Sequence, residues 1–421
     1  MSKTLRSKVH VPTLATDLRG AAQLTTQATL GITRLTEGVH QSVWGTVGVP
    51  GGKPHKGTAS TRGITGLVYS AVRGVTQLVG KTADTVLARL TPLLESADAA
   101  PKESDQRVAV LAALNGVLGD HLHATRNPLA ARMTLRYRGH VLDWKAQPLL
   151  PGATQDAPLT GKVLVIIHGL CMNDLQWTHT DEAGVTHNHG DALAAAQGYT
   201  PVYVRYNTGL HTSQNGAEFS RQLTQLVSRW PVPITEISVL AHSMGGLVTR
   251  SAAAQADAPA WLPLLKNIVF LGTPHHGAPL ERAGNWVDVI LGSTPYSRPF
   301  AKLGQLRSAG ITDLRYGHVL ESDWKGHERF RRKPDSRTHV PLPEGVNCFT
   351  VAATVAKPRS LLAERLVGDG LVPLHSALGL HDVTHRNLNF PKSRQAVVYR
   401  ANHMDLLWSP VVRDQLLTWL G

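Results

Sequence analysis

An α/β fold built on a mostly parallel sheet is predicted for the second half of this chain, on three observations. Apolar segments of strand length alternate there with segments whose apolar residues recur at helical spacing. One strand, Ile234 to Ala241, runs into the sequence small-x-Ser-x-Gly at residues 241–245. Another, Val163 to Ile167, is continuously apolar and opens into a loop that begins His168-Gly169. Uninterrupted apolar strands separated by helices are typical of parallel sheets with helices on both faces.

The individual elements follow in a regular order. Strands are predicted at Met133 to Trp144, Val163 to Ile167, Thr200 to Tyr206, Ile234 to Ala241, Ile268 to Leu271, Val346 to Val355 and Gln395 to Tyr399. A helix is predicted over Ala217 to Trp230, because Phe219, Leu223 and Leu226 share one face and Pro231 ends it. A second helix is predicted over Leu247 to Ala256.

The turn at residues 241–245 makes Ser243 the candidate nucleophile. A strand that passes directly into a helix must turn sharply there, and the turn lifts the serine hydroxyl above the sheet. Ala241 and Gly245 have a steric reason to be small, since larger side chains would collide with the neighbouring strand and the following helix.

A carboxylate and a histidine follow the serine in the chain. His403 is the candidate base, because a serine hydroxyl must lose its proton as it attacks a carbonyl. Asp369 is the candidate acid that orients the imidazole. Asp405 competes for that role but would have to fold back on its neighbour, and Asp382 is a further alternative without a strand end to support it.

Backbone N–H groups are the expected donors to a developing oxyanion. The loop after the strand at 163–167 can present the N–H of Leu170, and the serine turn can present that of Met244. Both residues would act through the main chain, so changes to their side chains are expected to be mild.

Together these segments resemble the lipase and esterase branch of the α/β-hydrolase superfamily. The matching pieces are residues 241–246, the strand with its His168-Gly169 loop, Gly272 to Gly277, and Gly368 to Pro373. Similar sequences occur in bacterial triacylglycerol lipases and in the inositol deacylases that act on glycolipid anchors. Ala241 stands where many members have glycine. The resemblance covers roughly residues 161–421 and implies an α/β-hydrolase fold, a Ser-His-Asp triad and no cofactor.

Four histidines near these segments have structural interpretations beside the chemical ones. His242 is expected to pack, because adjacent residues on a tight turn point in different directions, and His168 is expected to brace the oxyanion loop. His275 and His276 either line an acyl pocket or hydrogen-bond their own loop.

A second histidine cluster has metal-ligand side chains without a strict metal pattern. It comprises His179, Asp181, Glu182, His187 and His189. Its end also fits a helix entrance before an alanine-rich run, and no metal is predicted. Cys171 and Cys348 are the only cysteines, so a disulfide framework is not expected, although a single bond is allowed.

Length and composition fit one catalytic domain at residues 131–421 and an extension at 1–130. An insertion at 278–343 interrupts the strand and helix alternation. Its first part is apolar and it contains a basic run at 327–333, so it is expected to be either a lid over an acyl pocket or an ordinary packed insertion.

Charge is concentrated near the start of the chain. The formal net charge is +13, and residues 1–150 hold 18 Lys and Arg against 9 Asp and Glu. The sequence has no apolar run of membrane-spanning length and no apolar stretch of the signal-peptide kind, so a cytoplasmic location is expected, or one peripheral to a membrane or lipid surface. Nucleic acid is not an expected partner, because the basic residues are scattered and aromatics make up only 5%.

The extension carries helical patterns of its own. Apolar residues recur at three- and four-residue steps from Ile64 to Leu90, and shorter stripes run from Ile32 to Val43 and from Val108 to Leu118. A Gly-, Pro- and Lys-rich link at 45–63 separates the first two. Glycines inside the long stripe disfavour an isolated helix, so residues 1–100 are expected to lie on a surface, either protein or lipid.

Three functions agree with these residues. The first expectation is a serine hydrolase, an esterase or lipase, acting on lipid-like esters. An acyltransferase would use the same triad. A catalytically silent hydrolase fold, serving as a lipid-surface binding or scaffold protein, would typically have lost a triad member, whereas all three candidates are present here.

Overall fold

The computed structural model describes residues 105–146, 149, 159–255, 259–278, 307–327, 335–356 and 368–421. Apart from residues 125–129, these belong to one compact unit. The stripes expected between residues 32 and 90 and the link at 45–63 lie outside the described residues, so the extension at 1–104 stays a prediction.

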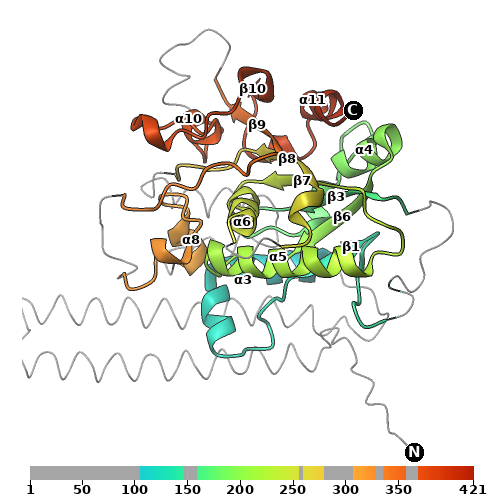
Figure 1. The fold of residues 1–421 in the computed structure, drawn as a ribbon, viewed down its shortest axis with the longest axis horizontal. Helices are drawn as coiled ribbons and strands as arrows, with labels where there is room; N and C mark the ends of the chain where they lie inside the picture. The colour runs from blue at the N-terminus through green and yellow to red at the C-terminus, as the bar shows by residue number, and fades with distance from the viewer. Residues whose placement is uncertain are drawn as a thin grey trace, which may run out of the picture. The chain divides into compact units, whose positions relative to one another are not determined.

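An eight-stranded sheet forms the centre of the unit (Figure 1). Its strands are β1 (Thr134–Tyr137), β2 (His140–Val141), β3 (Lys162–Ile167), β6 (Thr200–Arg205), β7 (Glu236–His242), β8 (Leu265–Leu271), β9 (Asn347–Thr354) and β10 (Gln395–Tyr399). Their spatial order is β10-β9-β8-β7-β3-β6-β1-β2. Strands β3, β6, β7, β8, β9 and β10 pair in parallel. Strand β1 is antiparallel to both β6 and β2. The predicted mostly parallel sheet is confirmed.

The centre of the sheet is β3, which pairs with β6 on one side and β7 on the other. Val165, for example, lies opposite Val202 of β6 and Val239 of β7, and all three side chains are buried. A strand covered on both faces has no solvent side, which explains why its sequence is continuously apolar.

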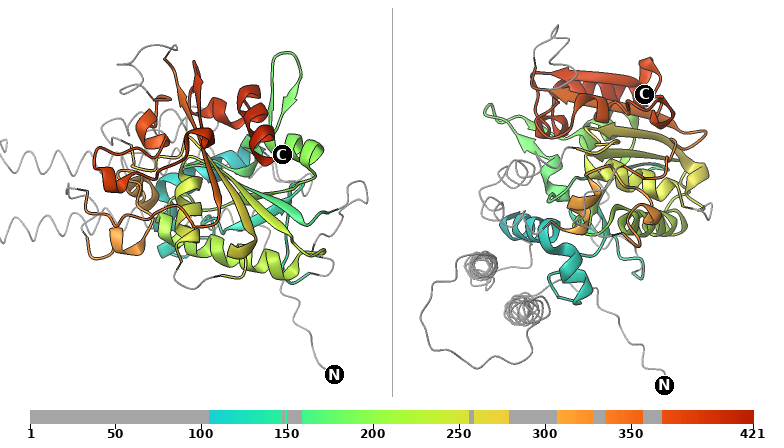
Figure 2. Two further views of the ribbon diagram at one scale, coloured as in Figure 1. Left: turned by 45° about the horizontal axis from the view of Figure 1, so that its top comes forward. Right: turned by 90° about the vertical axis from the view of Figure 1, so that its left-hand side faces the viewer.

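Helices cover both faces of the sheet (Figures 1 and 2). On one face α5 (Thr212–Arg229) packs on α6 (Met244–Ala253), and on the other α4 (His189–Gln197) packs on α11 (Pro410–Leu420). The predicted stripe of α5, Phe219, Leu223 and Leu226, is completely buried. At Gly216 an added Cβ would lie 2.3 Å from Ser251 Oγ, so the close approach of α5 to α6 requires a glycine.

Helix α3 (Asp105–Ala124) packs in the same unit, across the domain boundary expected at residue 130. An added Cβ would lie 2.1 Å from Cys171 Sγ at Gly116 and 1.8 Å from Asn207 Oδ1 at Gly119. Asn207 Nδ2 also donates a 2.9 Å hydrogen bond to the Gly119 carbonyl. The two glycines allow the helix to approach loops that follow β3 and β6, which its weak apolar stripe did not indicate.

Shorter elements complete the described part of the chain. They are the β4 (His179–Thr180) and β5 (Thr186–His187) hairpin, α8 (Ala309–Asp313), α10 (Leu374–Ala377), and the 3-10 turns η2 (Asp174–Trp177), η3 (Leu262–Leu264), η6 (Glu321–Asp323), η7 (Thr384–Arg386), η8 (Lys392–Arg394) and η9 (Met404–Leu407). Within the described residues, no helix combines the length and the apolar character needed to cross a membrane.

The described part of the 278–343 insertion is packed against α5. The buried carboxylate of Asp313, in α8, accepts hydrogen bonds from the Thr212 amide (2.8 Å) and from His211 Nδ1 (3.0 Å). This contact agrees with a packed insertion over residues 307–327. Residues 279–306 lie outside the described residues, so a lid there stays a prediction.

Both cysteines are buried free thiols. Cys171 lies in the loop after β3 and Cys348 in β9. Burial raises the pKa of each thiol to about 12, because the charged thiolate loses its hydration in an apolar surrounding.

We therefore expect neither thiol to react with a disulfide reagent such as dithionitrobenzoate in the folded protein. Only the thiolate attacks, and a raised pKa leaves almost none of it at about pH 8. In guanidinium chloride both thiols should react, which supplies the control for reagent and protein quality. Rapid release of one mole of thionitrobenzoate per mole of native protein would contradict the burial of one of the two cysteines.

Candidate active site

The turn between β7 and α6 holds Ser243 in a strained conformation. Strand β7 ends at His242, α6 begins at Met244, and Ser243 between them has φ 54° and ψ −124°. Positive φ is uncommon for residues with a Cβ and persists only where the surroundings enforce it. Here the Ser243 amide donates a 2.8 Å hydrogen bond to the carbonyl of Leu271, at the end of β8. The predicted sharp turn is therefore present at this serine.

The small residues around Ser243 are explained by contacts with the neighbouring strands. A Cβ on Gly245 would lie 2.7 Å from the carbonyl oxygens of both Ile167 and His168. A Cβ on Gly246 would lie 2.0 Å from Thr273 Oγ1. The first half-turn of α6 thus fits only without side chains at these two positions, in agreement with the steric argument made for Gly245.

Asp369 and His403 form a buried pair. His403 Nδ1 lies 2.6 Å from Asp369 Oδ2, and both side chains are about 1% exposed. The other carboxylate oxygen accepts the amides of Leu371 (2.9 Å) and Val372 (2.7 Å), which fixes the plane of the carboxylate. The His403 amide in turn donates to the Asp369 carbonyl at 3.1 Å. Because a carboxylate only accepts, Nδ1 carries the proton and Nε2 is the basic nitrogen.

The two competing carboxylates lie in different surroundings. Asp405 Oδ2 accepts the amide of Asn402 at 2.8 Å, as a cap of its own turn. Asp382 is exposed on the surface. The geometry therefore favours Asp369 as the partner of the imidazole.

His403 lies against the serine turn. His242 Nε2 donates a 3.1 Å hydrogen bond to the His403 carbonyl, and the two imidazole rings are 4.5 Å apart. Gly272 follows Leu271, whose carbonyl accepts the Ser243 amide. A Cβ added to Gly272 would lie 3.0 Å from His403 Cε1. Ser243 Oγ is buried and has no hydrogen-bond partner among the described residues. No described residue therefore competes with a base for this hydroxyl.

The loop after β3 lies directly over the turn. A Cβ on Gly169 would lie 2.9 Å from the Ser243 Cβ. Cys171 has a positive φ of 58° and donates its amide to Thr208 Oγ1 at 3.0 Å, which holds the loop in place. Leu170, between them, is buried. Met244 is the first residue of α6, so its N–H is not used by the hydrogen bonds of the helix.

The two histidines beside these groups are neutral supports. Tyr206 donates from its hydroxyl to the His168 carbonyl at 2.9 Å and stacks on the His168 ring at 4.7 Å. Burial lowers the pKa of His168 to about 4. Burial, followed by the neighbouring His403, also lowers the pKa of His242 well below its usual value. The positions of both agree with the expected bracing and packing roles.

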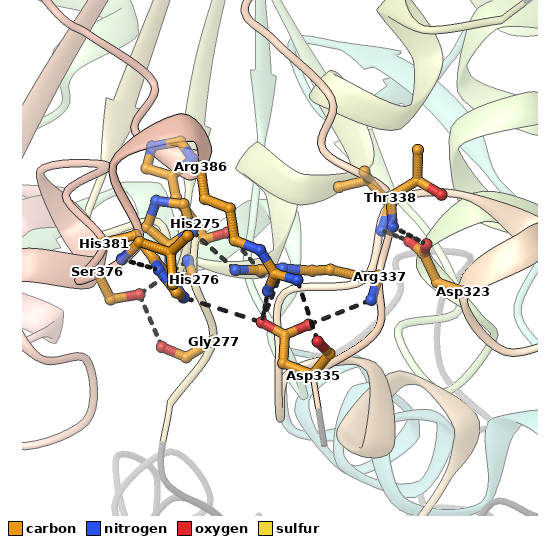
Figure 3. Close-up of polar contacts among 12 residues, drawn as sticks. His275, His276, Gly277, Asp323, Asp335, Arg337, Thr338, Ser376, His381 and Arg386 are labelled. Atoms are coloured by element: carbon orange, nitrogen blue, oxygen red, sulfur yellow. Dashed lines mark hydrogen bonds and ion pairs between the residues drawn. The ribbon is translucent and has the colours of Figure 1, made fainter. Parts of the chain in front are cut away.

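His275 and His276 take part in a cluster of arginines (Figure 3). Arg337 donates to the His275 carbonyl (3.1 Å) and to His276 Nδ1 (2.8 Å). The His276 amide donates to Ser376 Oγ at 3.1 Å. Sequence reasoning missed this cluster because its arginines come from distant parts of the chain.

The second histidine cluster forms a hairpin and a helix entrance. His187 Nε2 pairs with Asp181 Oδ2 at 2.9 Å in the hairpin. His189 is the first residue of α4, after the Asn188 cap, and its Nε2 donates to the Leu406 carbonyl at 3.0 Å. The helix-entrance interpretation is confirmed. Across the described ranges of the chain, no group of three or more His, Cys, Asp or Glu side chains is arranged to hold a metal ion.

Comparison with known proteins gives distant similarities. Residues 132–313 match a family model described as a domain of unknown function, DUF7379. No curated protein matches the sequence. Among solved structures, the mature lipase BlEst2 of Bacillus licheniformis has a TM-score of 0.41 and 17% identity, over 64% of this chain and 96% of that one. Lipase B of Aspergillus fumigatus has 0.36 and 11%, over 64% and 55%.

A third similar structure is the esterase Pf2001 of Pyrococcus furiosus, with a TM-score of 0.35 and 12% identity, over 62% of this chain and 83% of that one. At such identities the similarity concerns the fold only, and the fold is established by the chain's own topology. A mostly parallel sheet in this strand order, with a serine in the strained turn between β7 and α6, gives the chain the α/β-hydrolase fold.

Proposed function

We propose that this chain is a serine hydrolase that cleaves carboxylic esters, with lipid-like esters as its preferred class. The observation that carries the proposal is the buried 2.6 Å contact between His403 Nδ1 and Asp369 Oδ2, on a histidine packed against the strained turn of Ser243. A carboxylate bound to Nδ1 would orient the imidazole so that Nε2 can act as the base toward the Ser243 hydroxyl.

In the proposed mechanism, His403 Nε2 takes the proton of Ser243 while Oγ attacks the carbonyl carbon of the ester. Asp369 keeps its hydrogen bond to Nδ1 and stabilises the imidazolium. The carbonyl electrons move onto oxygen, where the N–H groups of Leu170 and Met244 bind the oxyanion. The bond to the alcohol then breaks, and His403 gives the proton to the leaving oxygen. Water repeats these steps on the acyl-enzyme and releases the acid.

Two alternatives share parts of this mechanism. An acyltransferase would use the same residues with a second alcohol in place of water, and product analysis with added alcohol distinguishes the two. A catalytically silent fold would keep the sheet without the chemistry. The Asp369 and His403 pair, held by four hydrogen bonds, supports the enzyme instead.

Replacing Ser243 by Ala should abolish labelling by a fluorophosphonate probe and lower the hydrolysis of p-nitrophenyl butyrate by roughly 10⁴-fold or more, because the nucleophile is lost. Ser228→Ala, on the exposed side of α5, is the matched control and should keep normal probe labelling and normal ester hydrolysis. Near-normal turnover by Ser243→Ala would place the nucleophile elsewhere. A series of p-nitrophenyl esters of rising acyl length then tests the lipid-like preference.

Replacing Asp369 by Asn should lower kcat by roughly 10⁴-fold, since the amide would favour the wrong imidazole tautomer. Asp382→Asn and Asp405→Asn are the control carboxylates and should retain most activity. Unfolding midpoints measured for all three variants separate loss of chemistry from loss of fold. Full activity in Asp369→Asn, combined with a large loss in one of the controls, would reassign the acid.

We further propose that residues 1–100 attach the protein to an anionic lipid surface on the cytoplasmic side. The proposal is supported by the long apolar stripe, its interior glycines and the excess of basic residues in this part of the sequence. Each well-placed basic residue contributes about 1 kcal/mol at such a surface. Attachment would raise the local concentration of an embedded ester substrate.

Full-length protein should therefore co-sediment with phosphatidylserine vesicles at low salt and less at high salt, because salt screens the basic residues. A chain beginning at Pro101 should stay in solution and still hydrolyse a short soluble ester. Equal sedimentation of both chains would overturn the lipid proposal. An insoluble truncated chain would assign the extension to protein packing instead.

A further inference from the structure

A basic hollow lies beside α6, away from the serine turn. Its lining includes Arg250, His275, His276, Val319, Arg337 and Arg386. Arg250 follows Ser243 by seven residues on α6, which corresponds to about 10 Å of helical rise. The walls come from two sources. One is α6 with the loop after β8 and η7, and the other is the described part of the insertion.

Three guanidinium groups line the hollow, and two carboxylates lie beside them; Figure 3 shows Arg337 and Arg386 with Asp335 and Asp323. Asp335 pairs with Arg386, and its Oδ2 lies 3.4 Å from Arg337 Nε. The carboxylate of Asp323 accepts hydrogen bonds from backbone amides, including those of Val319 and Thr338, both at 3.1 Å. Arg250 is the third guanidinium. The lining therefore has a net positive charge even with every histidine neutral.

Two buried side chains in this lining have polar atoms without a hydrogen-bond partner among the described residues. Arg250 is 5% exposed; one terminal nitrogen donates to the Val340 carbonyl at 2.6 Å, but its Nε has no partner among the described residues. His275 is 1% exposed, and neither of its ring nitrogens has a partner in the described part of the chain. Leaving such groups unsatisfied typically costs about 1–3 kcal/mol each, more for a charge.

The charge of these groups favours an anion over a metal. Histidines are common metal ligands, but guanidinium groups at the same hollow repel a cation. Burial, followed by the neighbouring Arg337, lowers the pKa of Arg250 to about 9, and a bound anion would favour its charged form. Guanidinium groups bind tetrahedral oxyanions with strong, charge-assisted hydrogen bonds.

The size of the hollow selects a small ligand. The hollow has about 280 Å³ of empty space, a volume that includes open solvent, and its enclosed part has room for about one water molecule. The enclosed part is too small for a nucleotide base or an acyl chain, so a ligand would have to be small and lie mostly in the open part of the hollow, as one phosphate group would.

We propose that this hollow binds one phosphate group, which accepts hydrogen bonds from Arg250 and His275 and bridges the insertion to α6. The bound group would join residues 317–319 and 337–340 of the insertion to the core of the hydrolase. Its two sources are free inorganic phosphate and a phosphate monoester such as a lipid headgroup. The proposal does not depend on the serine chemistry.

The test is the melting temperature of the full chain as phosphate replaces chloride at constant ionic strength. If phosphate binds only the folded state, Tm should rise by about 3 °C when the phosphate concentration is ten times Kd. The rise per added millimolar of phosphate should become smaller at higher concentrations. Non-specific stabilisation by phosphate is also known, but it grows without saturation and does not depend on one arginine. Phosphorus NMR line broadening measures the same binding without unfolding the protein.

The variant Arg386→Gln should weaken phosphate binding at least tenfold, and Arg250→Gln should do the same from the buried side. Arg413→Gln, which removes an exposed arginine on α11, is the matched control and should leave binding unchanged. A Tm rise that does not saturate and is equal in all variants would overturn the proposal. Titration with glycerol 3-phosphate distinguishes the sources: tighter binding than inorganic phosphate assigns the site to a monoester headgroup, and weaker binding to the free anion.

Discussion

The positive φ of Ser243 is the constraint on which the rest of the site depends. Strand β7 ends in this conformation and is followed at once by α6, which starts against the carbonyls of Ile167 and His168. The residue is kept there by the Leu271 carbonyl, so three neighbouring strands meet at one point. Strain at this position is balanced by packing across the whole sheet, because parallel pairing aligns the ends of β3, β7 and β8.

The fold and the turn could be predicted because their signals are local. Strand β3 is apolar throughout, α5 shows one buried stripe, and the serine lies between small residues. Each of these patterns reflects contacts that its own residues make. The pairing of Asp369 with His403 was predicted from chain order together with the resemblance of residues 368–373 to α/β-hydrolases, since order alone also fits Asp382.

Two features could not be predicted because their causes are distant in the sequence. Helix α3 approaches the loop after β3 through Gly116 and Gly119, and a glycine pair gives no apolar periodicity. The arginine cluster combines Arg250, Arg337 and Arg386, which lie far apart in the sequence, so no short motif contains two of them. His275 illustrates the result. Its neighbours in the chain indicated an acyl pocket or a loop contact, but its ring packs against Phe270 and Phe390, its carbonyl accepts from Arg337, and it lines the hollow with the three arginines.

The contact of Gly116 with Cys171 has a consequence for where this hydrolase can be divided. The loop that holds Leu170 over the serine is supported from behind by a helix that starts at Asp105. A fragment cut at the apparent start of the sheet, near residue 131, would keep every residue of the triad and lose that support. A fragment that keeps this support therefore has to include the helix from Asp105, and a partner fused to its N-terminal side has to be joined upstream of that helix.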